Sequence, residues 1–212
     1  MTRRVLVLGA GGNCRDIVDA MLDAGGFEPL GYLDDDPAKT ELGGLPVHGP
    51  LDSWRDHPDA LFVNGLNGVE LTPRKRELLD RLGIPDDRWV GVTHPTASVS
   101  RMAEVGIGTV ILQNVTVNSA ARVGDHVMIL PNSVVSHDAV VGSYSYLTPG
   151  VVLAGYVEVG EGAYLGAGSA VRHRVRIGAG AVVGMGSVVL DDVAPRTIVR
   201  GVPARIAPPA SA

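Results

Sequence analysis

Cysteine, aromatic side chains and long apolar runs are all scarce in this 212-residue sequence. Cys14 is the only cysteine, so no disulfide bond can form within the chain, and a reducing compartment fits the composition. No apolar run approaches the roughly 20 residues that a membrane-spanning helix needs. Glycines also interrupt the apolar start too early for a signal peptide. We therefore expect a cytoplasmic protein without membrane insertion.

Basic residues are outnumbered, with 18 Lys and Arg against 23 Asp and Glu, so the net charge of -5 gives no reason to expect a nucleic-acid partner. The charge divides unevenly, with -6 in residues 1–95 and +1 in residues 96–212. Aromatic residues make up only 4% of the chain whereas glycine accounts for 28 residues, which indicates a core of small side chains arranged in a repeat. We place a small α/β domain at 1–92 and a repeat domain at 93–212.

Every sixth residue of the second half is aliphatic, and the residue two before it is small or of modest size. The sixteen aliphatic positions are Val99, Val105, Ile111, Val117, Val123, Ile129, Val135, Val141, Leu147, Leu153, Val159, Leu165, Val171, Ile177, Val183 and Val189. A period of six fits neither a helix nor a simple strand, but it fits coils of three short strands, each with one side chain pointing inward. The sequence therefore predicts a left-handed parallel β-helix of about five 18-residue coils, uninterrupted by a long loop.

One corner of this triangular prism is expected to take glycine in every coil. Gly106, Gly124, Gly142, Gly160 and Gly178 recur every 18 residues, each directly after an inward aliphatic residue. We attribute this preference to the backbone angles that glycine adopts.

The first half is typical of a Rossmann-like unit. Residues 4–22 read as strand, glycine turn and helix, and a second strand at Leu30–Leu33 leads into an acidic run at 34–36. A third strand is expected near residues 60–68. A helix is expected to begin with Thr72 as N-cap and to end at Gly83.

A glycine turn between strand and helix lets a phosphate approach backbone N–H groups. The fingerprint is imperfect, because its third glycine position is Cys14. Fewer than 95 residues precede the repeat, so a mononucleotide-sized site fits and a full dinucleotide-binding domain does not. Two alternatives stay open: the glycines form only a tight turn, and the acidic run is only a solvated turn.

The repeat contains a histidine followed by an aspartate, His137-Asp138. His137 and His173 each lie two residues after an inward aliphatic residue and are two coils apart, so they share a column and lie roughly 10 Å from each other. Gly155 lies between them and predicts a groove on the outer surface where an extended ligand could lie. The alternative is that His137 is only an exposed corner residue.

A metal site like that of the γ-class carbonic anhydrases is not expected here. The column supplies two histidines, whereas catalytic zinc usually has three protein ligands.

The glycine-turn unit, the stretches VTHPTASV, SHDAVVG, VVLAGYVEVG and GAYLGAGSAV, and the closing GVPAR resemble the sialic-acid O-acetyltransferase-like family of hexapeptide-repeat sugar acyltransferases. The resemblance covers nearly the whole chain. It implies acetyl-CoA as co-substrate, a nucleotide-linked amino-sugar of the 4-amino-4,6-dideoxy type as acceptor, and a homotrimer with active sites between subunits.

The resemblance also implies roles for individual positions. The catalytic base falls on His137, and the acidic residue that raises its basicity falls on Asp138. The cofactor-binding positions are Tyr146, Gly155, Ala167 and Met185. The substrate-binding positions are Gly11, Gly12, Asn13, Asp34, Asp35 and Gly65.

The sequence departs from the family pattern at four places. Asn13 replaces a histidine and Cys14 replaces a glycine in the turn, Leu130-Pro131 replaces Asn-Thr, and Tyr146 stands where some relatives have histidine. The Leu130 change is expected to remove a polar contact to the acceptor.

The expected reaction is attack of an amine on the thioester, with His137 taking the proton and the Gly155 N–H as a candidate oxyanion donor. Two other functions stay open: O-acetylation of a sugar or sialic-acid hydroxyl, and nucleotide-sugar binding without catalysis.

Overall fold

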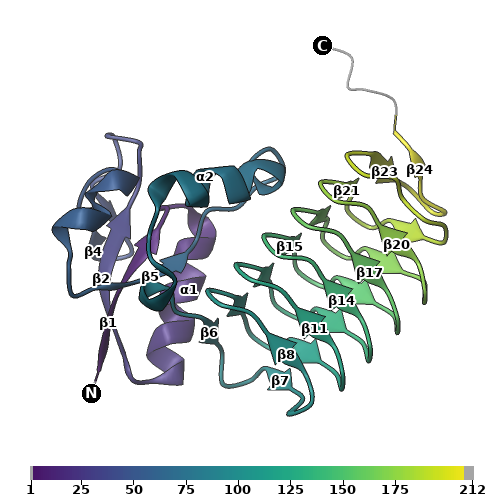
Figure 1. The fold of residues 1–212 in the computed structure, drawn as a ribbon, viewed down its shortest axis with the longest axis horizontal. Coiled ribbons are helices and arrows are strands. Elements are labelled where there is room, and N and C mark those ends of the chain that lie inside the picture. The colour runs from purple at the N-terminus through teal and green to yellow at the C-terminus, as the bar shows by residue number, and fades with distance from the viewer. Residues whose placement is uncertain (1, 208–212) are drawn as a thin grey trace.

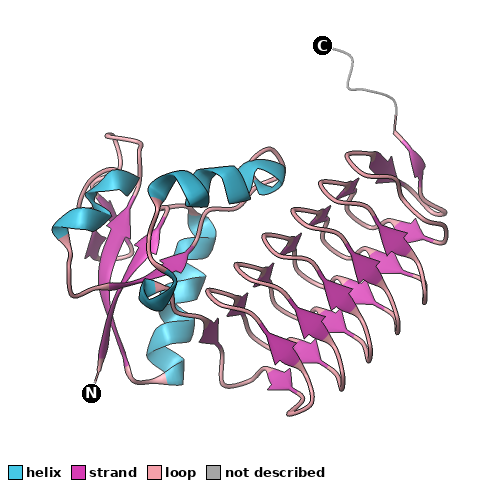
Figure 2. Cartoon of the chain, in the orientation of Figure 1, coloured by secondary structure: helices cyan, strands magenta, loops and turns pink. Residues whose placement is uncertain are grey.

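The computed structural model describes residues 2–207, which form a small α/β unit and a parallel β-helix (Figures 1 and 2). The unit lies beside the first coils, and later coils follow one another away from it (Figure 1). The fold class predicted from the sequence is therefore confirmed. Residues 208–212 of the expected C-terminal tail lie outside the described residues.

The α/β unit has a three-stranded parallel sheet in the order β2-β1-β5. Its strands are β1 (Arg3–Leu8), β2 (Phe27–Leu33) and β5 (Leu61–Asn64), with a small antiparallel pair, β3 (Glu41–Leu42) and β4 (Leu45–Pro46). Its helices are α1 (Gly12–Ala24) and α2 (Lys75–Leu82), with 3-10 turns η1 (Leu51–Asp56), η2 (Thr72–Arg74) and η3 (Asp86–Arg88). Residues 5–8 of the central strand are fully buried, which explains the continuous apolar run.

The start of the second helix differs from the prediction. The Thr72 hydroxyl donates to the Gly68 carbonyl at 2.7 Å, and residues 72–74 form a 3-10 turn. The α-helix begins only at Lys75, with no side-chain cap. The predicted end is confirmed, because Gly83 follows the helix in the left-handed conformation with φ 63°.

The β-helix has three faces, numbered here in chain order from β7. Face 1 comprises β7 (Ser98–Val99), β10 (Thr116–Val117), β13 (Val134–Val135), β16 (Val152–Leu153), β19 (Ala170–Val171) and β22 (Val188–Val189). Face 2 comprises β8 (Glu104–Val105), β11 (Arg122–Val123), β14 (Val140–Val141), β17 (Glu158–Val159) and β20 (Arg176–Ile177). Face 3 comprises β6 (Val92–Thr93), β9 (Val110–Ile111), β12 (Met128–Ile129), β15 (Tyr146–Leu147), β18 (Tyr164–Leu165), β21 (Val182–Val183), β23 (Ile198–Arg200) and β24 (Arg205–Ile206).

The predicted period holds from coil to coil. Thr116 pairs with Val134, and Val134 with Val152, each a step of 18 residues. The inward aliphatic side chains from Ile111 to Val189 are buried. The first two predicted core positions are not, because Val99 is half-buried and Val105 is 41% exposed. β8 is an edge strand of face 2, so Val105 has a neighbouring coil on one side only.

The explanation given above for the repeated glycines is wrong. Gly124, Gly142 and the other three have no positive φ. A Cβ at Gly142 would instead lie 2.6 Å from the Glu161 backbone nitrogen in the next coil, and one at Gly124 would lie 2.6 Å from the Ser143 nitrogen. Close approach of successive coils therefore requires glycine in this column.

Left-handed backbone angles occur in a different set of corner residues, which recur every six positions. From 108 to 186 these residues are Gly108, Asn114, Ala120, His126, Asn132, Asp138, Tyr144, Gly150, Tyr156, Gly162, Gly168, Arg174, Gly180 and Gly186. Each corner of the prism thus has one left-handed residue, and many of these residues are not glycine.

The α/β unit covers face 3. Ile17 and Met21 of α1 belong to one buried cluster with Met128 and Tyr146 of face 3. Farther along, Arg76 of α2 makes two hydrogen bonds of 3.0 and 3.1 Å to the Glu161 carboxylate at the corner between faces 2 and 3.

The other two faces differ in chemistry. Face 2 presents exposed charged side chains, among them Glu158 and Arg176. Face 1 presents an apolar stripe of half-buried or exposed side chains: Val134, Val152, Ala170 and Val188. The buried cluster that joins α1 to face 3 includes none of these four residues, so among the described residues the α/β unit packs on face 3 and not on this stripe.

Candidate active site

His137 and Asp138 form a hydrogen-bonded pair at the corner between faces 1 and 2. The Nδ1 of His137 lies 2.8 Å from Oδ2 of Asp138. A carboxylate can only accept, so Nδ1–H donates and Nε2 keeps its lone pair for accepting a proton. Asp138 is the left-handed residue of its corner, with φ 58°, a conformation that Asp tolerates better than most residues. The backbone of the repeat therefore turns this carboxylate back toward the preceding imidazole.

The imidazole of His137 lies against Gly155 in the next coil. A Cβ at position 155 would be 2.6 Å from Cε1 and 2.7 Å from Nε2 of the ring. The backbone of the two coils is joined there by the Tyr156 N–H, which donates to the His137 carbonyl at 3.2 Å. The predicted stacking of Gly155 next to His137 in one column is confirmed. The groove expected at Gly155 is not present there, because the His137 ring occupies that space.

The Gly155 N–H donates no hydrogen bond within residues 2–207. It lies beside the ring that carries the free Nε2, so it stays a candidate donor for an oxyanion.

Two residues near His137 escaped the sequence analysis. The ring of Tyr156 meets the His137 ring edge-on, with centroids 5.3 Å apart, and the Arg174 guanidinium lies 5.0 Å from the Tyr156 ring centroid. Asp138, Tyr156 and Arg174 form the left-handed column that follows His137 at 18-residue spacing, and this spacing could have found them. His173 is exposed, two coils from His137.

The glycine turn leaves its backbone open. Gly11 is the N-cap of α1 with φ -95°, and no side chain caps the helix. A Cβ added at Gly11 or Gly12 would meet nothing within 4 Å. The packing of the chain thus does not require glycine at either position, and the open turn gives a ligand access to the backbone N–H groups of α1.

Asp34 joins the glycine turn to the end of β2. Its Oδ2 accepts from the Ala10 N–H at 2.7 Å and from the Lys39 ammonium at 2.9 Å, and its Oδ1 accepts from the Asp36 N–H at 2.9 Å. Burial alone would raise the pKa of Asp34, but the hydrogen bonds from Lys39, Asp36 and Ala10 outweigh burial and lower it. Asp34 is therefore ionised, and its carboxylate oxygens already accept hydrogen bonds from backbone N–H groups of the protein itself.

Asp35 is also used in the fold, since its Oδ1 accepts from the Leu51 N–H at 2.8 Å. Both aspartates border an open cavity of about 380 Å³ at the carboxyl edge of the sheet. The charged and polar residues that line it are Asp34, Asp35, Asp36, Lys39, Thr40 and His48.

Gly65 lies under the turn, where its N–H donates to the Leu8 carbonyl at 2.9 Å. A Cβ at Gly65 would be 2.6 Å from the sulfur of Cys14, the residue that replaces a glycine of the family pattern. Close packing against Cys14 therefore requires glycine at position 65. Burial raises the pKa of the Cys14 thiol to about 11, which makes it a poor nucleophile.

The four predicted cofactor positions do not meet within one chain. Gly155 lies at the corner between faces 1 and 2, beside His137. Ala167 and Met185 stack at the corner between faces 3 and 1, where the Gly186 N–H donates to the Ala167 carbonyl at 2.8 Å. Tyr146 is buried on face 3, under the α/β unit.

Two departures from the family pattern contact each other. The Asn13 side-chain amide donates to the Tyr146 hydroxyl across the domain boundary. Burial raises the pKa of Tyr146 to about 12. Leu130 is buried in the same interdomain cluster, where its side chain packs against apolar neighbours.

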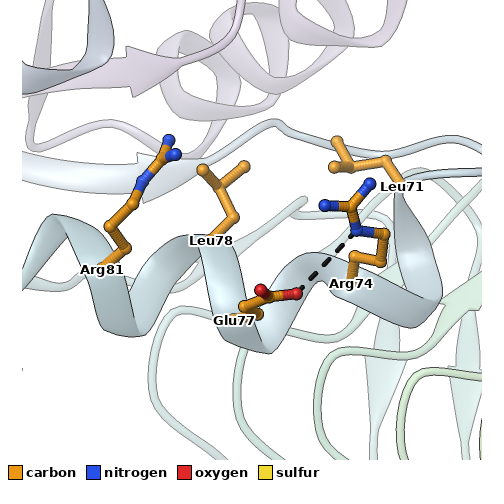
Figure 3. Close-up of a pocket in the computed structure, with 5 residues that line it drawn as sticks. All are labelled: Leu71, Arg74, Glu77, Leu78 and Arg81. Atoms are coloured by element: carbon orange, nitrogen blue, oxygen red, sulfur yellow. Dashed lines mark ion pairs between the residues drawn. The ribbon is translucent and has the colours of Figure 1, made fainter.

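Other surface features lie away from these residues. A groove of about 410 Å³ runs along α2 between Leu71, Arg74, Glu77, Leu78 and Arg81, and it contains none of the predicted site residues (Figure 3). No group of three or more His, Cys, Asp or Glu side chains within residues 2–207 is arranged to hold a metal ion. Among the described helices, none is both long and apolar enough to cross a membrane.

Comparison with known protein families matches both parts of the chain. Residues 4–63 match the PglD N-terminal domain, and residues 120–155 and 156–191 match the bacterial transferase hexapeptide repeat. The structure of PerB from Caulobacter crescentus in complex with CoA and GDP-perosamine has 31% sequence identity, covers 96% of this chain and 97% of that one, and superimposes with a TM-score of 0.84. The chain belongs to the hexapeptide-repeat family of sugar acyltransferases.

Two further proteins are similar to this chain. The acetyltransferase domain of PglB from Neisseria gonorrhoeae shares its fold, with a TM-score of 0.87, 24% identity, and coverage of 97% of this chain and all of that one. The UDP-N-acetylbacillosamine N-acetyltransferase of Bacillus subtilis is 33% identical over 115 residues, which span 52% of this chain and 51% of that protein.

Proposed function

We propose that the protein transfers the acetyl group of acetyl-CoA to the amino group of a nucleotide-linked amino-sugar, of the 4-amino-4,6-dideoxy type. The observation that carries this proposal is the His137–Asp138 pair, whose free Nε2 faces Gly155. The similarity to PerB, which was crystallised with CoA and GDP-perosamine, supports the choice of donor and acceptor class. The single cysteine, a free buried thiol, suits the cytoplasm as the site of action.

In the proposed reaction, the acceptor amine attacks the carbonyl carbon of the thioester. His137 Nε2 takes the proton that the amine loses, while Asp138 holds Nδ1–H and stabilises the imidazolium. The Gly155 N–H stabilises the oxyanion. The C–S bond then breaks, and the thiolate of CoA takes the proton from His137.

The proposed acceptor and cofactor residues are those named above. Gly11, Gly12, Asn13, Asp34, Asp35 and Gly65 bind the nucleotide-sugar, and Gly155, Ala167 and Met185 bind acetyl-CoA. Tyr146 is proposed to act from beneath the turn, through Asn13, because its ring is buried.

A homotrimer completes the site in this proposal. His137 lies at the corner of the prism opposite face 3, and face 3 is the face on which the α/β unit packs. The glycine turn of a chain is therefore on the far side of its own β-helix from His137. The apolar stripe on face 1, flanked by the Gly155 and Ala167–Met185 corners, offers the surface against which another copy would pack.

The deciding experiment is acetyl-CoA turnover, measured as free CoA release, with UDP-, dTDP- and GDP-sugars that carry or lack a 4-amino group. N-acetylation requires activity with the amino-sugars alone. Activity with the hydroxyl sugars would replace this proposal by O-acetylation, and binding of nucleotide-sugars without turnover would leave only a binding protein.

A further inference from the structure

Lys75, the first residue of α2, is fully buried between the α/β unit and the β-helix. It is the only lysine or arginine with a buried side chain in the part of the chain that the structure describes. The packing alone gives no reason for a lysine, since methionine has similar length and no charge to desolvate.

The ammonium group has polar neighbours but no counter-ion. Nζ donates to Oδ1 of Asn67 and lies 5.9 Å from the centroid of the Tyr146 ring. None of the ion pairs formed by residues 2–207 includes Lys75. Burial lowers the pKa of this amine to about 7, so both protonation states are populated near neutral pH.

The groups around Lys75 supply no negative charge at neutral pH. Tyr146 on β15 has a pKa of about 12, and His126, between β11 and β12, has a pKa that burial lowers to about 4. Both are therefore neutral. The next residue of α2, Arg76, is turned toward Glu161 at the surface.

The two contacts of Lys75 lead to the loops proposed for nucleotide binding. Asn67 belongs to the loop that follows β5, three residues after its last strand residue, Asn64. Tyr146 accepts a hydrogen bond from Asn13 at the open N-terminus of α1. The ammonium group thus lies beneath the loops at the carboxyl ends of β1 and β5, where α/β sheets bind phosphates. A diphosphate held there would supply the negative charge that the site lacks.

We infer that Lys75 is a positioning residue of the acceptor site: it balances the charge of the diphosphate through Asn67 and the Tyr146–Asn13 contact, and acceptor binding is coupled to uptake of a proton by Lys75. This inference rests on the proposed function. It predicts that an anionic ligand at the turn stabilises the charged amine, and that the charged amine in turn strengthens ligand binding, because the two effects are reciprocal.

The test is isothermal titration calorimetry with UDP-glucose, dTDP-glucose and GDP-mannose, repeated in buffers of different ionisation enthalpy. These diphosphate diesters have no phosphate proton and no sugar amine that titrates near neutrality, so proton uptake reports on the protein. The variant is Lys75→Met. The control is Arg74→Met. Arg74 directly precedes Lys75 in the chain, and its charged side chain is exposed instead of buried.

For wild type at pH 7.5 we expect uptake of a fraction of a proton with at least one nucleotide-sugar, and we expect Arg74→Met to behave the same. Lys75→Met should lose the uptake. For a pKa rise of one, it should bind about threefold more weakly at pH 7.5, and the difference should approach about tenfold well below pH 7. The affinity difference should shrink toward pH 9.5, where the free wild-type amine is neutral.

Binding without proton uptake, or equal uptake by Lys75→Met, overturns this inference and leaves the proposed function intact. If none of the three nucleotide-sugars binds wild-type protein, the inference and the nucleotide-sugar part of the proposed function both fall.

Discussion

Gly155→Ala should inactivate the protein while leaving His137 and the fold in place. Gly155 has no positive φ, so alanine is compatible with its backbone. The added methyl group, however, would lie 2.6 Å from Cε1 and 2.7 Å from Nε2 of His137. The ring must move by roughly 0.5–1 Å or rotate away, and a displacement of about 1 Å in a catalytic group can lower the rate about 100-fold. We expect a loss of kcat of that size.

The stability of Gly155→Ala should stay close to that of wild type. The His137 side chain is 53% exposed, so the ring can turn outward into solvent instead of being compressed in a core. The substitution keeps the N–H of residue 155, so a lost oxyanion donor would not explain the effect.

The assay is kcat at saturating acetyl-CoA and acceptor, together with the thermal midpoint. His137→Ala and the double variant Gly155→Ala/His137→Ala are the controls. If Gly155 acts through the ring, the double variant is no slower than His137→Ala alone. A Gly155→Ala enzyme within fivefold of wild-type kcat would refute the reasoning.

Three further predictions concern single side chains. Asp138→Asn and Asp138→Gly both suit the left-handed corner, so each should fold normally, lower kcat and shift its pH–rate profile; an unchanged rate and profile would make Asp138 a solvated neighbour. Asp34→Ala should raise the acceptor KM about tenfold and also lower Tm, because the Ala10 N–H and Lys39 lose their partner; a lower Tm with an unchanged KM would leave Asp34 only a structural role. For Lys75, the pKa of about 7 in the folded state lies below its ordinary value of 10.5, so the unfolded state binds more protons between these pH values and wild-type stability rises with pH across that window. Lys75→Met should therefore raise the free energy of unfolding most below pH 7, by up to about 5 kcal/mol, and the increase should vanish near pH 10.5. Urea denaturation at several pH values measures this increase, and an increase that does not depend on pH would contradict the prediction.

The β-helix could be predicted because each inward position imposes its own requirement every six residues. The reason for its glycines could not. Glycine occurs in two kinds of column, one kind in which successive coils approach closely and another in which the backbone is left-handed, and composition alone does not separate these causes. Residues such as Tyr144 and Arg174 occupy left-handed positions at two different corners, so a search for glycine alone does not find these columns.

The site was predictable where it is local in sequence. The adjacent His137 and Asp138 pair as expected, and the turn at Gly11–Gly12 is open as expected. Lys75 was missed because a lysine at the start of an amphipathic helix is typical of a solvent-facing residue. Only the packing of α2 against the β-helix buries it, and that packing depends on residues far apart in the chain, such as Arg76 and Glu161.

The arrangement of the site predicts that two inactive variants can restore each other. His137→Ala removes the base at the corner opposite face 3. Gly12→Glu places a carboxylate at the open N-terminus of α1, where it should repel a diphosphate without a steric clash, because a Cβ there meets nothing within 4 Å. If each active site combines the base of one copy with the acceptor loops of the next, trimers assembled at random from equal amounts of the two variants contain intact sites at roughly one quarter of the interfaces. Refolding the variants together should then give about a quarter of wild-type activity, whereas mixing them after separate refolding should give none until subunits exchange. Wild-type homotrimers and each variant refolded alone are the controls. If co-refolded trimers of confirmed mixed composition stay inactive, each active site is contained within one chain, and the proposed division of the site between copies is wrong.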